Sequence, residues 1–202
     1  ILPEVPVNDD MRHFFKENNY KCLASPGYQT IWLDLSPEES DLRAALKQKW
    51  RNMLNKAEKQ DISVEWDDEG QFLSWMLTKY KADKEHKGYE GPSLKVLAPL
   101  AKNFRNNQGL LIGRAILEGQ PIAAVMILCH GSSATYQVGW SSDKGRKSAA
   151  HNLLLWETIR ILKDKDIRYF DLGGINDTSA EGVKKFKEGL GGETVTYLGH
   201  YV

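Results

Sequence analysis

The chain has 202 residues, of which 41% are hydrophobic and 27% are charged. This composition supports a buried core rather than disorder, and the balance of 27 basic against 27 acidic residues argues against stable DNA binding or broad attraction to an anionic membrane. The longest apolar run, Ile122 to Cys129, is far shorter than the ~20 residues of a membrane-spanning helix, so we expect a buried strand and no membrane span. Cys22 and Cys129 lie far apart in the sequence, which favours a reduced compartment and a cytoplasmic protein.

The first part of the chain predicts a lead-in, a strand and a long helix. Residues 1–27 show no clean period apart from a short helix expected over Asp10 to Asn18, so we assign a lead-in segment followed by one domain over residues 28–202. Tyr28 to Leu35 alternates and is rich in β-formers, which predicts the first strand. Ser36-Pro37-Glu38-Glu39 has the pattern of a capping box. The helix that it opens carries one apolar stripe, made of Leu42, Leu46, Trp50, Met53, Leu54 and Ala57.

The middle of the chain predicts a short strand and two further helices. Ile62 to Trp66 is the strand, and the next helix carries an apolar stripe that should end near Gly88. A third helical stretch, around Leu94 to Phe104, is expected to be broken at Pro99, because proline removes a hydrogen bond from a helix interior.

Three consecutive strands are then predicted, over residues 110–117, 121–129 and 134–140. Their short links indicate antiparallel neighbours, and we expect the 121–129 strand to be central. Ser148 to Lys163 is apolar on several faces, as a helix pressed against a sheet would be.

The last part of the chain predicts a strand, a helix and a strand. Ile167 to Leu172 ends at two glycines, Thr178 and Glu181 form a second capping box, and Glu193 to Tyr201 reads as a final strand. The element order indicates an α/β fold with a mixed, mostly antiparallel sheet and helices on both faces.

Three stretches in this order carry a family resemblance. They are KWRNMLNKAEKQDISVE (Lys49 to Glu65), YFDLGGI (Tyr169 to Ile175) and GVKKFKEGLGGE (Gly182 to Glu193). These stretches resemble the Fem-type aminoacyltransferases, which have the GNAT acyltransferase fold, and the likeness extends over roughly residues 28–201. The resemblance implies transfer of an aminoacyl or other activated acyl group to an amine, such as one on a peptidoglycan precursor. Fem-type enzymes usually have two lobes, so the resemblance also implies a second lobe or a homodimer partner for this chain.

The segment Asp143 to Ala150 bears on the acyl donor. The CoA-using branch of the fold normally carries paired glycines here, whose N–H groups and helix N-terminus hold the pyrophosphate. This chain keeps Arg146 but lacks the paired glycines. The resemblance therefore implies aminoacyl-tRNA as the donor in preference to acyl-CoA, and we expect no bound cofactor and no metal.

Lys187 and Asp171 are the candidate catalytic residues. Forming an amide needs positive charge or N–H donors beside the carbonyl oxygen and an acceptor for the amine proton. Lys187 follows the buried stripe residue Phe186 and is assigned to the oxyanion, although a solvated lysine near a helix end is the alternative. Asp171, at a strand end beside glycines, is assigned to accept a proton or orient the amine, although it could instead cap the turn.

Seven further residues are candidates for substrate binding. Arg51 suits phosphate or carboxylate recognition, although a surface salt bridge is the alternative, and Arg146 with Lys147 precedes a helix that could hold a phosphate. The full set is Phe186, Tyr169, Gly173, Gly174, Arg51, Arg146 and Lys147. His151 lies near the same loop, but no histidine pair has metal-ligand spacing. Trp50, Trp75, Trp140 and Trp156 are interpreted as core residues and not as base-stacking platforms.

Three hypotheses of function remain at this point. The first is an acyl or aminoacyl transferase acting on an amine. The second is a non-catalytic GNAT-like module that binds a peptide, a glycan or a partner lobe, since a fold does not fix a function. The third is an ordinary acyl-CoA-dependent N-acyltransferase.

Overall fold

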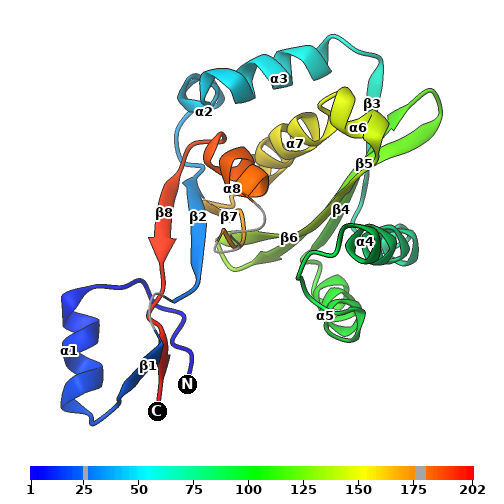
Figure 1. The fold of residues 1–202 in the computed structure, drawn as a ribbon. Helices are drawn as coiled ribbons and strands as arrows, with labels where there is room; N and C mark the ends of the chain where they lie inside the picture. The colour runs from blue at the N-terminus through cyan, green and yellow to red at the C-terminus, as the bar shows by residue number, and fades with distance from the viewer. Residues whose placement is uncertain (25–26, 176–180) are drawn as a thin grey trace.

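The structure, a computed structural model, describes residues 1–24, 27–175 and 181–202, so the predicted capping residue Thr178 lies outside the described residues. The main body is a sheet of seven strands in the order β3-β4-β5-β6-β7-β2-β8 (Figure 1). Only β6 and β7 run parallel, and every other neighbouring pair in this sheet is antiparallel. The strands are β2 (Gln29–Asp34), β3 (Ile62–Asp67), β4 (Leu110–Leu117), β5 (Gln120–His130), β6 (Ser133–Ser141), β7 (Tyr169–Asp171) and β8 (Glu193–Thr196). The predicted α/β class is confirmed.

Helices cover both faces of this sheet (Figure 1). A hydrophobic core lies between the helices and the sheet on each face. One face carries α2 (Glu39–Ala45), α3 (Gln48–Glu58) and α7 (Ala150–Asp164), and the other carries α4 (Leu73–Lys87) and α5 (Leu94–Asn106). The helix α4 ends at Gly88, as predicted, and Gly88 has the left-handed conformation common at helix ends. None of the helices in the described part of the chain is long and apolar enough to cross a membrane.

The strand β5 is buried on both faces but is not the middle strand. It lies third in the order, and β6 occupies the centre. The β4-β5-β6 meander is antiparallel, as the short links predicted. The predicted helix of residues 153–162 lies within α7 and packs on this meander, with Leu154 and Leu162 fully buried.

A β-bulge in β6 decides which side chains face the site. Ile127 of β5 pairs with Tyr136, whereas the preceding Met126 pairs with Val138, so Gln137 is an extra residue in β6. Such an insertion shifts the alternation of side chains along the strand. Tyr136 therefore packs with the core on the α7 face, while Val138 packs with the core on the α4 face.

The prediction of one long helix from the apolar stripe is wrong, because the structure has two helices there, α2 and α3. Leu46 and Lys47 have extended backbones between α2 and α3, and the Lys47 N–H donates to the Gly189 carbonyl at 2.9 Å instead of continuing a helix. The predicted capping box also fails, because α2 begins at Glu39 without a side-chain cap and the Ser36 N–H donates to the Asp34 carboxylate.

Two further boundaries differ from the prediction. The predicted break at Pro99 is absent, and α5 continues through this residue. Leu97 and Ala101, on either side of Pro99, are fully buried. The helix predicted from Ser148 is preceded by a short helix, α6 (Asp143–Lys147), and Ala149 in the left-handed region separates the two.

The lead-in packs against the end of the chain (Figure 1). The helix α1 (Asp9–Glu17) is followed by β1 (Cys22–Ala24), which pairs with β9 (His200–Tyr201) in a separate sheet of two strands. Phe15, Leu198 and Tyr201 form a third core there. The predicted single strand of residues 193–201 is thus wrong, because its two ends join different sheets.

Candidate functional site

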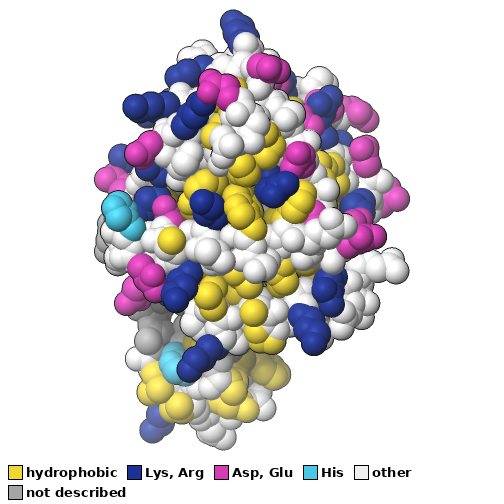
Figure 2. Space-filling model, turned by 90° about the vertical axis from the view of Figure 1, so that its right-hand side faces the viewer, with side chains coloured by type: hydrophobic (Ala, Val, Ile, Leu, Met, Phe, Trp, Pro, Cys, Tyr) yellow, Lys and Arg dark blue, Asp and Glu magenta, His cyan; other side chains and the backbone are white. Residues whose placement is uncertain are grey.

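A cavity of about 1330 Å³ opens beside the central strand β6. Its walls come from β6, the start of α7, the segment after β7, the helix α8 (Glu181–Glu188) and the loop of residues 87–92. Ligand pockets typically measure ~300–1,000 Å³, so this one has room for a large ligand or for two. On the face drawn in Figure 2, basic and acidic side chains are interspersed with apolar ones.

Lys187 is buried in the wall of this cavity. It is 7% exposed, its Nζ donates to the Gly174 carbonyl at 2.9 Å, and the same Nζ lies 5.7 Å from the centre of the Tyr136 ring. Burial lowers the pKa of Lys187 from 10.5 to about 8, although the nearby Asp171 charge opposes the shift. Lys184 and Lys185 on the same helix are exposed. The side chain of Lys187 is therefore not the solvated lysine of the alternative interpretation.

The two glycines after β7 shape the wall around this ammonium group. Gly173 has φ +74°, a conformation that side chains rarely adopt. A Cβ on Gly174 would lie 2.8 Å from the ring of Tyr28. Burial, together with the Asp171 charge, raises the pKa of Tyr28 to about 12. The glycines thus let the chain turn closely past Tyr28 and present the Gly174 carbonyl to Lys187.

Asp171 lies behind this wall rather than in the cavity lining given by the described residues. Its Oδ1 accepts a hydrogen bond from the Gly173 N–H at 2.7 Å and another from the Thr30 hydroxyl. This geometry is that of a carboxylate capping the glycine turn, the alternative raised by the sequence. Its charge still acts on Lys187 by favouring the ammonium form.

The other candidates separate into those at the cavity and those away from it. Phe186, Gly173, Gly174 and Arg146 line the cavity with Lys187. Arg51 instead donates to the Ala44 and Leu46 carbonyls at 2.7 and 2.9 Å, where it closes the end of α2. Tyr169 and Lys147 also lie outside the lining found among the described residues.

Tyr136, Gly139 and His151 belong to the site, although no candidate list drawn from the sequence included them. The Tyr136 hydroxyl and His151 Nε2 lie 2.8 Å apart, and the His151 ring contacts that of Phe186 at 5.7 Å between centroids. A Cβ on Gly139 would lie 2.0 Å from the Tyr136 hydroxyl oxygen. The glycine therefore makes room for the pair. In the sequence, the position of His151 near the segment of residues 143–150 is a signal, whereas nothing marks Tyr136 as its partner.

Four backbone donors in the segment from Ser142 to Ala149 are already occupied. The N–H groups of Gly145, Arg146, Ser148 and Ala149 each donate to an oxygen of the segment itself. The Arg146 guanidinium donates to the Ser141 carbonyl at 2.6 Å and pairs with Asp143. A Cβ on Gly145 would lie 2.1 Å from the Ile122 carbonyl oxygen, so this glycine serves packing against β5. These four N–H groups are thus not free to bind the pyrophosphate of CoA in this structure.

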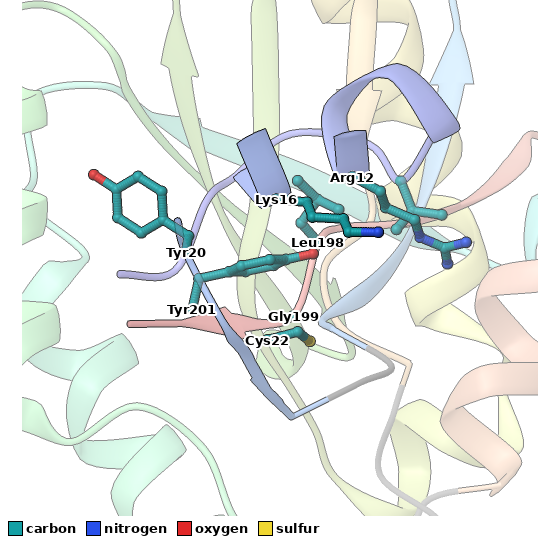
Figure 3. Close-up of a pocket in the computed structure, with 8 residues that line it drawn as sticks. Arg12, Lys16, Tyr20, Cys22, Leu198, Gly199 and Tyr201 are labelled. Carbon is teal, nitrogen blue, oxygen red and sulfur yellow. The ribbon is translucent and has the colours of Figure 1, made fainter. Parts of the chain in front are cut away.

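A second hollow, of about 350 Å³, lies in the small N-terminal sheet. Figure 3 shows the charged ends of Arg12 and Lys16 on the same side of the Tyr201 ring, with Cys22 below. Of the residues that the structure describes, it shares only Gly199 with the large cavity. Among the described residues, no group of three or more His, Cys, Asp or Glu side chains has an arrangement that could hold a metal ion.

Residues 40–188 match the family described as acetyltransferase (GNAT) domain. The chain belongs to this family. It is therefore a GNAT acyltransferase, and the non-catalytic module loses support. A search of curated proteins found no match.

Solved structures show the same fold in Fem-type and related proteins. The crystal structure of FemX superposes with a TM-score of 0.84 at 15% identity, covering 100% of this chain and 70% of FemX. The C-terminal domain of a putative lysylphosphatidylglycerol synthetase from Agrobacterium fabrum gives 0.64 at 11% identity, covering 97% of this chain and 65% of that one. L-PGS from Bacillus licheniformis gives 0.61 at 12% identity, covering 95% and 65%. The predicted GNAT fold of Fem type is confirmed, and the chain spans about two thirds of the length of these relatives.

Proposed function

We propose that this acyltransferase moves an aminoacyl group from aminoacyl-tRNA to a primary amine, with a peptide amine such as that of a peptidoglycan precursor as acceptor. The observation that carries the proposal is Lys187, a buried ammonium group held between the Gly174 carbonyl and the Tyr136 ring in the wall of a large cavity. The cavity volume supports it, since the terminal nucleotide of a charged tRNA and an acceptor amine must both enter.

Lys187 supplies the charge that the reaction requires. When the neutral amine attacks the ester carbonyl, a C–N bond forms and the carbonyl oxygen becomes an oxyanion. A preorganised ammonium group in a site that excludes water stabilises that developing charge far more than it stabilises the neutral carbonyl. The C–O bond to the ribose then breaks, which leaves the amide and a free hydroxyl on the tRNA.

The occupied N–H groups of the Ser142–Ala149 segment support tRNA over acyl-CoA as the donor. In that segment a pyrophosphate would have to displace hydrogen bonds that Gly145, Arg146, Ser148 and Ala149 already make. The competing function is that of a CoA-dependent N-acyltransferase. For CoA to bind through this segment, the hydrogen bonds of these N–H groups would have to break.

The test is a transfer assay with tRNA charged with a radiolabelled amino acid and a peptide carrying one free lysine amine. We expect label to appear in the peptide and calorimetry to show CoA binding no tighter than ~1 mM, about 4 kcal/mol. Micromolar CoA binding together with acetyl transfer to the peptide would overturn the choice of donor. The absence of transfer from every charged tRNA tried would overturn aminoacyl transfer itself.

A further inference from the structure

The amine must lose a proton after it attacks, and the residue predicted to accept that proton is poorly placed. Asp171 does not line the cavity among the described residues, and its Oδ1 is already bonded to Gly173 and Thr30. Two carboxylates from the described part of the chain do line the cavity, from α4 and the loop after it: Asp83, which pairs with Lys87 at 2.7 Å, and Glu90. Neither is among the charges that shift the pKa of Lys187. The acceptor must therefore be sought among the cavity groups nearest to Lys187.

Tyr136 and His151 are those groups, and both line the cavity. Their hydroxyl oxygen and Nε2 lie 2.8 Å apart. Tyr136 places its ring under the Lys187 ammonium, and His151 packs its ring on Phe186. The bulge at Gln137 and the missing side chain of Gly139 together create the space for this pair.

The second nitrogen of His151 is unusual. His151 Nδ1 is buried and has no hydrogen-bond partner among the described residues. Leaving a buried polar atom unpaired costs ~1–3 kcal/mol, and such atoms in native proteins call for an explanation, catalysis among them. A neutral imidazole has one donor and one acceptor nitrogen, so an acceptor nitrogen is available either to Tyr136 or at the unpaired position.

We infer that Tyr136 and His151 form the proton acceptor for the attacking amine, an inference that rests on the proposed function. Tyr136 touches the amine in this reaction. The amine nitrogen forms the C–N bond and passes its proton to the Tyr136 oxygen, while the Tyr136 proton moves to His151 Nε2. When the C–O bond breaks, the proton returns through Tyr136 to the leaving oxygen, so both residues end as they began.

The charges around the pair fit a transient acceptor. Burial and the Lys187 charge lower the pKa of His151 to about 4, so the ring is neutral near pH 7. Within the described ranges, two titratable groups face the His151 ring, Tyr136 from β6 and Lys187 from α8. Asp171 lies behind Lys187 and favours its ammonium form. Burial raises the pKa of Tyr136, and the charge of Tyr89 raises it further. The ammonium charge of Lys187 lowers the proton affinity of His151. When an oxyanion forms beside Lys187, it offsets that charge, so the proton affinity of His151 rises at the step in which the amine loses its proton.

The test uses His151→Ala and Tyr136→Phe in the tRNA-to-peptide transfer assay, with rescue by added imidazole. General base catalysis typically contributes ~100-fold to 10,000-fold, so we expect kcat to fall about 100-fold or more with KM for the charged tRNA little changed. Imidazole should restore His151→Ala, and weakly basic pyrazole, which has the same shape, should not. His86→Ala, on the exposed end of α4, is the matched control and should retain full activity.

Several results would overturn the inference. Unchanged kcat in His151→Ala is one, and equal rescue by pyrazole is another, because it would mean that the ring only fills space. NMR of protein labelled with ¹⁵N-histidine decides independently of activity: a neutral His151 ring at pH 6 supports the pair, whereas an imidazolium at pH 6 overturns it. If the unaltered protein transfers nothing, the proposed function fails and the role of the pair toward an attacking amine fails with it. The NMR result then tests only the protonation state of His151.

Discussion

Lys187 differs from its neighbours on α8 in the surroundings of its charge. Lys185 is exposed and pairs with Glu181 at 2.6 Å, whereas Lys187 is buried against Gly174 and Tyr136. We expect Lys187→Met to lower the transfer rate by ~100-fold or more, about 3 kcal/mol, because one preorganised donor to the oxyanion is lost. Lys185→Met should change the rate little. Comparable rates for the two variants would show that Lys187 does not stabilise the oxyanion.

The lowered pKa of Lys187 also predicts how stability depends on pH. The unfolded chain binds this proton up to pH ~10.5, whereas the folded chain releases it near pH 8. Between these values the unfolded state binds more protons, so the free energy of unfolding rises with pH. We expect the stability difference between the unaltered protein and Lys187→Met to shift in favour of the unaltered protein from pH 8 to 10.5. Urea unfolding at a series of pH values measures it, and a constant difference contradicts the buried charge.

The same pKa governs activity in the opposite direction. If the ammonium form of Lys187 stabilises the oxyanion, kcat should fall as the pH rises through about 8. Lys187→Arg keeps its charge at every accessible pH, so the fall near pH 8 should disappear from its pH profile whatever its absolute rate. A fall that persists in this variant would assign the titration to another group.

At the scale of elements, Gly145 joins α6 to the strand β5. A Cβ at this position would meet the Ile122 carbonyl oxygen at 2.1 Å, whereas a Cβ on Gly182 of α8 would meet nothing within 4 Å. We expect Gly145→Ala to destabilise the protein by ~1–3 kcal/mol through overpacking, and Gly182→Ala to be neutral or slightly stabilising. Thermal unfolding compares the two. An unchanged midpoint in Gly145→Ala would show that α6 can move away from β5.

Element boundaries show where periodicity is informative and where it is not. Five of the six positions in the stripe from Leu42 to Ala57 are buried as predicted, and Met53 is half-buried. The stripe could not reveal the break at Lys47, because that N–H bonds to Gly189, a residue far along the chain. At Pro99 the sequence predicted a break that does not exist. Burial of α5 against the sheet outweighs the local cost of a proline inside the helix.

At the scale of the whole molecule, the small N-terminal sheet has a hydrophobic core of its own, separate from the two cores of the main sheet. It can therefore be destabilised separately from the main sheet. Phe15 is 6% exposed and packs on Tyr201, whereas its neighbour Phe14 is 52% exposed. We expect Phe15→Ala to destabilise this part by ~3–5 kcal/mol and Phe14→Ala to have little effect. Hydrogen exchange at Tyr201 reports on the small sheet and exchange at Val125 on the main one. Equal exchange at Tyr201 in both variants would contradict the packing.

The candidate site shows the same division between local pattern and topology. Lys187 and Phe186 could be predicted from the stretch GVKKFKEGLGGE, and Gly173 and Gly174 from the stretch YFDLGGI, because each stretch is contiguous in sequence. Tyr136 and His151 could not, because they meet only through the bulge in β6 and the packing of α7 on it. Arg51 was predicted to bind a ligand from its residue type, but the break between α2 and α3 supplies the carbonyls that it binds.

The buried ammonium of Lys187 has one more consequence, for the durability of the enzyme. A lysine whose pKa is about 8 is a free amine in roughly half of the molecules at that pH, and it lies in the cavity proposed to receive an activated ester. Once deprotonated it competes with the acceptor as a nucleophile, and its acylation would block the site permanently. Storage or assay above pH 8 with an activated donor and no acceptor should therefore inactivate the protein. Mass spectrometry should then find the added acyl group on Lys187.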